Sequence, residues 1–271
     1  MHRTTIAAGL VLASAFSVTA GTAAHAASPT DEAPLAVTAK GAPFSVAARV
    51  SENEPVQGHR IRFRGSVTPV VPGTKVTLQL RYSGQRSWKD VDTRGLSPDG
   101  WFRFHDRVST VRKRRYRVVA APTDGHAAGR SASLKVTVFG WRDLTSLSPA
   151  TYSGFGEVAD GVKMNGVAYP SSLRSYAAYP AGTPSSIDYN LDRACKLFRG
   201  VAGLDDSSPA AGTAQIQMSA DGTVRYTGAF GLTQAAPVAF DVTQVFRLTV
   251  AATPANGGAA AVGTPQVLCS F

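Results

Sequence analysis

Short runs in which apolar and polar residues alternate recur along the chain, and no segment shows a sustained apolar repeat of helical period. In residues 60–64, Ile61 and Phe63 alternate with arginines, and residues 75–82 continue in the same way. An alternation of period two is typical of strands that bury one face and expose the other. Gly, Pro and Asp separate the runs, as they do between strands. The chain is therefore predicted to be all-β.

Charge divides the chain into two parts that meet near Gly140. Residues 40–142 contain 20 Lys and Arg against 7 Asp and Glu, whereas residues 143–271 contain 7 against 9. Each part is long enough to bury a core of its own. We interpret the change as a boundary between two domains, a strongly basic one at residues 41–139 and a second at residues 142–271.

Each half has enough predicted strands for a β-sandwich. Several short strands within about 100 residues are typical of an immunoglobulin-like (Ig-like) sandwich, which we expect for residues 41–139. In the second half, Asp221-Gly222 lies between two runs and is a strong hairpin signal. The strand candidates there are residues 186–191, 196–204, 213–220, 223–227, 237–242, 245–251 and 265–270.

The N-terminus has the pattern of a signal peptide, which we assign to residues 1–26. Residues 2–3 are basic, residues 6–18 are apolar, and Ala24-His25-Ala26 supplies small residues for cleavage. The apolar run is too short for a mature membrane-spanning helix; a buried N-terminal helix is the alternative. Residues 27–40 are predicted to be a flexible lead-in. We expect a secreted, extracellular protein without a membrane span.

Two cysteines remain in the predicted exported chain, Cys195 and Cys269. A disulfide between them is the expectation in an oxidising compartment. On the chain-entropy account it would stabilise the fold by about 4 kcal/mol. Free thiols or a metal site are the alternatives, although structural zinc needs four ligands and residues 142–271 contain no His.

A series of short phrases in the second half resembles a known family. An apolar run leads into the adjacent carboxylates of Asp205-Asp206. The full series is Met164-Asn165-Gly166-Val167-Ala168-Tyr169-Pro170, Leu204-Asp205-Asp206, Ala220-Asp221-Gly222, Phe240-Asp241-Val242 and Pro265-Gln266-Val267-Leu268-Cys269. It resembles the NPCBM family, a family 51-like carbohydrate-binding module found beside glycosidases. The resemblance covers residues 142–271, and it implies a jelly-roll (galactose-binding-like) sandwich.

The first half resembles bacterial Ig-like modules that are appended to secreted enzymes. The similarity lies in residues 76–88, 99–102 and 116–119. We expect Trp88 and Trp101 to fill the core of this sandwich.

The pair Asp205-Asp206 has three interpretations. The carboxylates could cap a turn through hydrogen bonds from backbone N–H groups. They could hold a structural calcium ion, because hard cations take carboxylate and carbonyl oxygens from loops. They could also accept hydrogen bonds from sugar hydroxyls. No other cofactor is expected.

Sugar binding normally needs an aromatic face beside polar groups. Tyr176 and Tyr179 are our aromatic candidates, with Tyr152 and Phe155 as further ones. Tyr176 stands where the family usually has a His, and the Trp that usually opens the family's final strand is missing. These departures leave open an alternative, a structural or protein-interaction protein whose jelly roll has lost its sugar site.

The basic half suggests a polyanion surface. Its candidates are Arg112, Lys113, Arg114 and Arg115, extended by Arg60, Arg62, Arg64, Arg81 and Arg117. A field of this sign attracts teichoic acids, acidic glycans, nucleic acid or anionic lipid. An ordinary solvated face is the alternative, and no nucleic-acid motif accompanies the charge, so no specific nucleic-acid binding is expected.

Catalysis is not expected. The second half has no His, so a Ser-His-Asp or Cys-His arrangement cannot form within it. A glycosidase-type carboxylate pair is the remaining alternative, and its candidates are Asp188, Asp205, Asp206 and Glu157. We therefore predict a monomeric, non-catalytic protein that holds cell-wall or extracellular polysaccharide through its second domain, with the basic domain as spacer or polyanion-binding surface.

Overall fold

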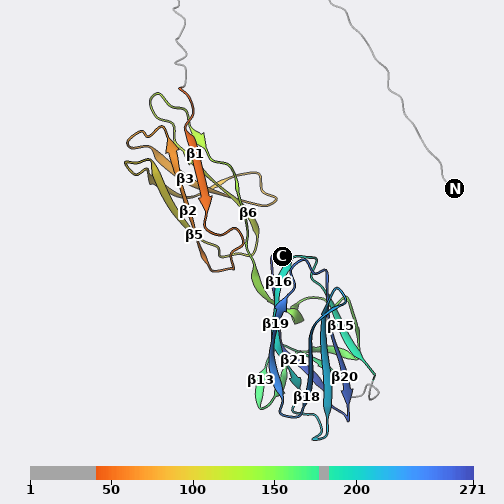
Figure 1. The fold of residues 1–271 in the computed structure, drawn as a ribbon. Coiled ribbons are helices and arrows are strands. Elements are labelled where there is room, and N and C mark those ends of the chain that lie inside the picture. The colour runs from red at the N-terminus through yellow and green to blue at the C-terminus, as the bar shows by residue number, and fades with distance from the viewer. Residues whose placement is uncertain (1–40, 177–182) are drawn as a thin grey trace, which may run out of the picture. The chain divides into compact units, whose positions relative to one another are not determined.

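The computed structural model describes residues 41–176 and 183–271, which are almost entirely strands and loops (Figure 1). The all-β prediction is confirmed. The predicted signal peptide, the lead-in and Tyr179 lie outside the described residues. Among the helical segments of the described part, none has the length and apolar character to cross a membrane.

The strands before Gly140 form two antiparallel sheets. One sheet has the order β1-β2-β5, with β1 at Ser45–Val50, β2 at Arg60–Thr68 and β5 at Trp101–Arg107. The other contains β4 (Lys89–Gly95), β3 (Lys75–Tyr82) and β6 (Lys113–Ala120), and β6 also pairs with β7 (Gly129–Arg130) and β8 (Leu134–Thr137). This is a β-sandwich, as predicted; its Ig-like assignment stays a prediction.

The core of the first sandwich follows from the alternation in its strands. Ile61 and Phe63 are fully buried, whereas the arginines between them are exposed. The ring of Phe63 lies 4.6 Å from that of Tyr116 on β6, across the space between the sheets. The buried Tyr116 donates a 2.5 Å hydrogen bond to Asp106, so its hydroxyl is satisfied inside the core.

A second sandwich with its own core begins at Gly140. One sheet has the order β10-β15-β20-β17-β18, and the other contains β11-β14-β21-β16-β19 with β9 paired to β21. The first comprises β10 (Thr151–Ser153), β15 (Ser185–Asn190), β20 (Arg247–Ala255), β17 (Thr213–Ala220) and β18 (Thr223–Gly231). The second comprises β9 (Gly140–Asp143), β11 (Phe155–Val158), β14 (Ser172–Ser175), β21 (Ala260–Cys269), β16 (Cys195–Leu204) and β19 (Ala235–Asp241). A 3-10 turn, η1 (Leu144–Ser146), follows β9.

A disulfide closes one end of the second sandwich. Cys195 and Cys269 face each other on β16 and β21 and are bonded, with their Cα atoms 4.0 Å apart. This bond confirms the predicted disulfide, and both cysteines are buried. It joins the last strand of the chain to the strand beside it and thereby restricts the unfolded chain.

A short hairpin covers part of the outer face of the sheet that holds β21. Its strands are β12 (Val162–Met164) and β13 (Val167–Tyr169). Asn165 and Gly166 join them with φ angles of 51° and 76°, as a type I′ turn requires. The buried Met164 packs with Ala261 in a small cluster separate from the main core.

Candidate functional site

Asp206 holds the turn of the β12–β13 hairpin. Its two carboxylate oxygens accept hydrogen bonds of 2.8 Å each, one from the backbone N–H of Asn165 and one from that of Gly166. The backbone N–H of Asp206 in turn donates to the carbonyl of Lys163 at 2.8 Å. Asp206 therefore fixes the hairpin against the end of β16.

Asp205 is buried and ionised beside an arginine. Its carboxylate accepts a 2.9 Å hydrogen bond from the backbone N–H of Ser207 and a 3.1 Å bond from Arg174 on β14. Burial on its own would raise the pKa of Asp205, but the Ser207 and Arg174 hydrogen bonds outweigh it and hold that pKa below its usual value. Only 8% of the Asp205 side chain is exposed, compared with 37% for Arg174.

Two further aspartates, from the motifs that resemble the NPCBM family, also accept hydrogen bonds from backbone N–H groups at turns. Asp221 accepts hydrogen bonds from the backbone N–H groups of Phe246 and Arg247, and these bonds lower the pKa of Asp221. Asp241 accepts a 2.8 Å bond from the N–H of Thr243, two residues on. The geometry thus matches the turn interpretation of these carboxylates.

The other interpretations of Asp205-Asp206 stay predictions. Each of the four oxygens already accepts a hydrogen bond from the protein. In the described part of the chain, no group of three or more His, Cys, Asp or Glu is placed to hold a metal ion. A calcium ion would need these oxygens together with further ligands.

Tyr176 is the aromatic candidate next to the Asp205–Arg174 pair. It follows β14 directly, its side chain is 47% exposed, and its N–H donates to the carbonyl of Gly154 at 2.9 Å. A Cβ atom built on Gly156 would lie 2.1 Å from the Tyr176 hydroxyl, so a larger residue there would displace this ring. Because side chains two residues apart on a strand share a face, Tyr176 and Arg174 project from the same side of the sheet.

The other aromatic candidates are distributed differently. Phe155 is fully buried in the core, so its proposed place on the surface was wrong. Tyr152 is 66% exposed, but it lies on β10 in the opposite sheet. Trp141 on β9, which was not among the candidates, has the guanidinium of Arg199 3.8 Å from its ring centroid, so one face of the ring is covered.

The run Arg112–Arg115 does not form one surface. Arg112, Lys113 and Arg115 are exposed, but Arg114 is only 3% exposed and donates to the Thr110 carbonyl at 2.5 Å. The inclusion of Arg114 in a polyanion site was therefore wrong. Because side chains alternate along β6, Arg114 lies on the same side as the buried Tyr116, opposite to Lys113 and Arg115.

Trp101 is the clearest departure from expectation in the first sandwich. It was expected in the core, but it is 59% exposed at the start of β5. Phe102 and Phe104 take the inward positions, so Trp101 shares the outward face with Arg103. Trp88 is half-buried, with the Arg117 guanidinium 4.2 Å from its ring centroid.

The second sandwich is a module of two antiparallel sheets. Residues 161–262 match the NPCBM/NEW2 domain, and this part of the chain is an NPCBM domain. The matched segment runs from the β12–β13 hairpin into β21 and includes Arg174, Tyr176, Asp205 and Asp206.

Two of the solved structures to which the chain is similar illustrate the range of matches. One is the CBM51 from Clostridium perfringens GH95 in complex with methyl-galactose, with 15% identity and a TM-score of 0.39, covering 47% of this chain and 99% of that one. The other is an allantoicase, with 10% identity and a TM-score of 0.27, covering 78% of each chain. No curated protein matches the chain.

Sequence reasoning missed Arg174, the ionic partner of Asp205. The two residues are 31 positions apart and meet because β14 and β16 both pair with β21. The alternation in β14 could have indicated this residue, because Arg174 is a charged residue between the buried Leu173 and Ser175.

Proposed function

We propose that the protein is a secreted, non-catalytic carbohydrate-binding protein and that its NPCBM domain holds cell-wall or extracellular polysaccharide. The observation that supports the site most directly is the exposed ring of Tyr176 beside Arg174, on a rigid sheet. The Asp205 carboxylate holds Arg174 by a 3.1 Å ion pair, which leaves the remaining guanidinium N–H groups free to donate to sugar hydroxyls. An aromatic face beside fixed donors is the usual design of a sugar site.

The disulfide supports the proposed location. Disulfides persist in oxidising compartments, and Cys195–Cys269 is buried within the fold. Together with the predicted signal peptide, this favours secretion.

The partners of the carboxylates support the non-catalytic role. A glycosidase uses a pair of carboxyl groups that flank the sugar bond. In the second sandwich, Glu157 accepts a hydrogen bond from the buried Tyr189, and Asp188 accepts one from Thr151. Asp205 and Asp206 are bound as described above, so each of the four candidates already serves a neighbour in the fold.

A glycan array probed with the whole protein tests the proposal. We expect binding to a subset of neutral glycans, and Tyr176→Ala should weaken it about tenfold, as truncation of a central aromatic contact does. Tyr152→Ala is the matched control, because it removes an exposed tyrosine from the opposite sheet. Failure to bind any neutral glycan, or equal losses for the two variants, would contradict the proposal.

One observation favours the alternative of a protein-interaction module. All four oxygens of Asp205 and Asp206 serve the fold, so this end of the sheet offers a sugar fewer free acceptors than the sequence suggested. In that case Tyr176→Ala would leave glycan binding unchanged, and cross-linking in the secreted fraction would recover a protein partner.

A further inference from the structure

The outward face of the sheet β1-β2-β5 carries arginines in rows that run across its strands. Arg49 on β1 lies opposite Arg64 on β2, and Arg64 lies opposite Arg103 on β5. Directly opposed residues of antiparallel strands project from the same face, about 5 Å apart. All three arginines are exposed, so their guanidinium groups occupy one surface.

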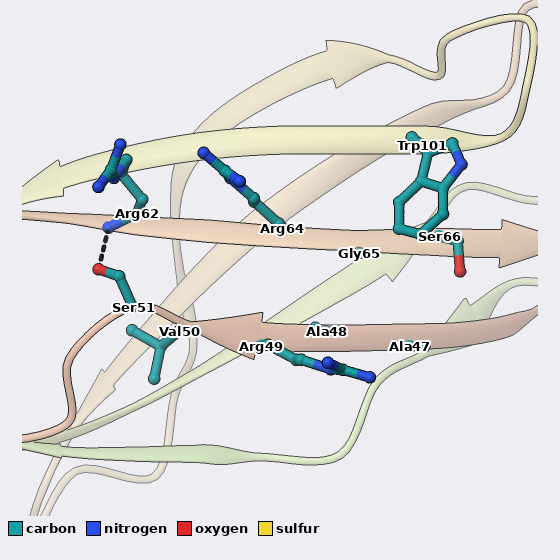
Figure 2. Close-up of a pocket in the computed structure, with 10 residues that line it drawn as sticks. All are labelled: Ala47, Ala48, Arg49, Val50, Ser51, Arg62, Arg64, Gly65, Ser66 and Trp101. Atoms are coloured by element: carbon teal, nitrogen blue, oxygen red, sulfur yellow. Dashed lines mark hydrogen bonds between the residues drawn. The ribbon is translucent and has the colours of Figure 1, made fainter.

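Two hollows meet at the centre of this face. One has a volume of about 510 Å³ and is lined by Arg49, Arg62, Arg64 and Trp101 together with small residues such as Ala47 and Ser66. Figure 2 shows Arg62 and Arg64 on one strand, with Arg49 and Trp101 on either side. The other, of about 590 Å³, shares Arg64 and Trp101 and continues to Arg103 and Arg94. Arg64 and Trp101 border both hollows, and we call the two hollows together the arginine groove.

Among the described residues, three arginines of the groove have no acidic partner, whereas Arg94 at its edge pairs with Asp92 at 2.8 Å. Within residues 41–176 and 183–271, Arg49, Arg64 and Arg103 take part in no ion pair. Asp106 is on the same sheet, but it turns inward and binds Tyr116. Like charges directly opposed across strands destabilise a sheet, so this arrangement costs the fold stability.

The field of the groove also acts on His105, which lies opposite Arg62. Desolvation, followed by the charges of Arg60, Arg94, Arg103 and Arg62, lowers the pKa of His105. The positive potential of these arginines therefore reaches the side chains that lie among them.

We propose that the arginine groove binds an acidic polysaccharide whose pyranose rings carry carboxylate or sulfate groups. The fork of an arginine matches both anions and can bind either through two parallel hydrogen bonds. Trp101 offers a flat apolar ring in the same groove, on which one face of a pyranose can stack. The site lies on other strands than Arg112–Arg115 and on another domain than Tyr176.

The single exposed aromatic ring of the groove, Trp101, favours an acidic polysaccharide over other polyanions. A polyol phosphate has no ring to place on Trp101. Proteins that bind single-stranded nucleic acid stack successive bases on several aromatic side chains, whereas Trp101 is the one large exposed aromatic residue that lines the groove. The choice of a sugar chain also rests on the proposed function, since a polysaccharide held by the NPCBM domain would bring such a chain to this protein.

Titration calorimetry of the whole protein at low ionic strength tests the proposal. The probes are polygalacturonate and dextran sulfate, with neutral dextran, polyglycerol phosphate and oligo(dT) for comparison. Arg64→Gln should weaken binding of polygalacturonate and dextran sulfate about tenfold, the effect of one lost charged hydrogen-bond pair. Arg115→Gln makes the same change of charge on the exposed face of β6 and should cost less than about twofold. Trp101→Ala should weaken both acidic glycans and leave polyglycerol phosphate unchanged.

Three outcomes would overturn the proposal. Equal losses for Arg64→Gln and Arg115→Gln would mean that only net charge attracts the probes. A greater loss for oligo(dT) than for polygalacturonate in Trp101→Ala would indicate nucleic acid, and failure to bind either acidic glycan would remove the site. If Arg64→Gln does not fold, Arg49→Gln and Arg103→Gln carry the same expectation. Tyr176→Ala should leave these affinities unchanged, so failure here and failure of the NPCBM site are distinguishable.

Discussion

In the second sandwich, Asp205, Asp206 and Asp221 accept hydrogen bonds from backbone N–H groups, whereas in the first sandwich Arg49 and Arg64 face solvent without an acidic partner. The carboxylates satisfy donors that the fold would otherwise leave unpaired at turns and strand ends. These two arginines form no ion pair in the described part of the protein, and they repel one another. A charged side chain that already has a hydrogen-bond partner in the protein is weak support for a binding site. A charged side chain without such a partner is stronger support.

The largest expected effect concerns the second sandwich alone. Replacing both cysteines, in Cys195→Ala/Cys269→Ala, should lower its free energy of unfolding by about 4 kcal/mol, because the unfolded chain regains the freedom of a long loop. The first sandwich has a separate core, so its unfolding should not change. Differential scanning calorimetry would show one transition moving to lower temperature. Equal shifts of all transitions would contradict the expectation that the disulfide stabilises the second sandwich alone.

Asp205→Asn should lower the free energy of unfolding by about 2 kcal/mol, because the hydrogen bonds from Arg174 and from the Ser207 N–H lose their charged acceptor. The exposed Asp160, changed in Asp160→Asn, is the control and should have almost no effect. Urea unfolding of both variants measures the difference. A loss as small as that of the control would show that Asp205 is not a structural carboxylate.

The same variant has a defined pH dependence. The pKa of Asp205 in the folded protein lies below its ordinary value of 3.8. Ionised Asp205 therefore stabilises the fold fully above that pH, and the contribution is lost as the pH falls through the folded-state pKa. The gap in stability between the native protein and Asp205→Asn should shrink below pH 3.8. A gap that stays constant in acid would contradict the ionised pair.

Arg64→Gln should act in the opposite direction on stability. Removing the central arginine relieves repulsion from Arg49 and Arg103 and should raise the free energy of unfolding by about 0.5 kcal/mol. Added salt should raise the stability of the native protein more than that of the variant, because salt screens exposed charges. Chemical unfolding at low and high salt measures both effects. Destabilisation by Arg64→Gln would mean that this arginine serves the fold after all.

Calcium should have the smallest effect. All four oxygens of Asp205 and Asp206 already accept hydrogen bonds, so neither calcium nor EDTA is expected to move the melting temperature. A bound ion would stabilise the folded state by mass action. A thermal melt with calcium and with EDTA checks this expectation, and a shift of several degrees would establish the calcium site that the sequence had suggested.

Much of the fold could be predicted because it depends on local alternation. Residues 213–220 were predicted as a strand and form β17 with the same bounds, and residues 196–204 differ from β16 by one residue. The short strands between Thr151 and Ser175 were missed. Strands of three or four residues have too few alternations to stand out from loops.

The errors at the candidate sites have one shared cause. Arg114 was grouped with its neighbours in sequence, although every second residue of β6 turns inward. Trp101 was assigned to the core for its size, although it has the parity of Arg103 and not of Phe102. In a strand the face of a residue follows from its position in the alternation, and residue type is the weaker guide.

The sequence alone determines that the protein forms two β-sandwiches, that the charge changes between them and that two cysteines are present to pair. Composition and period-two alternation are local properties, so they can be read from the sequence. The ion pair of Arg174 with Asp205, the use of Asp206 at the Asn165-Gly166 turn and the meeting of arginines from three strands depend on register between distant segments. Register is set when whole faces pack against a core, which no short stretch of sequence specifies.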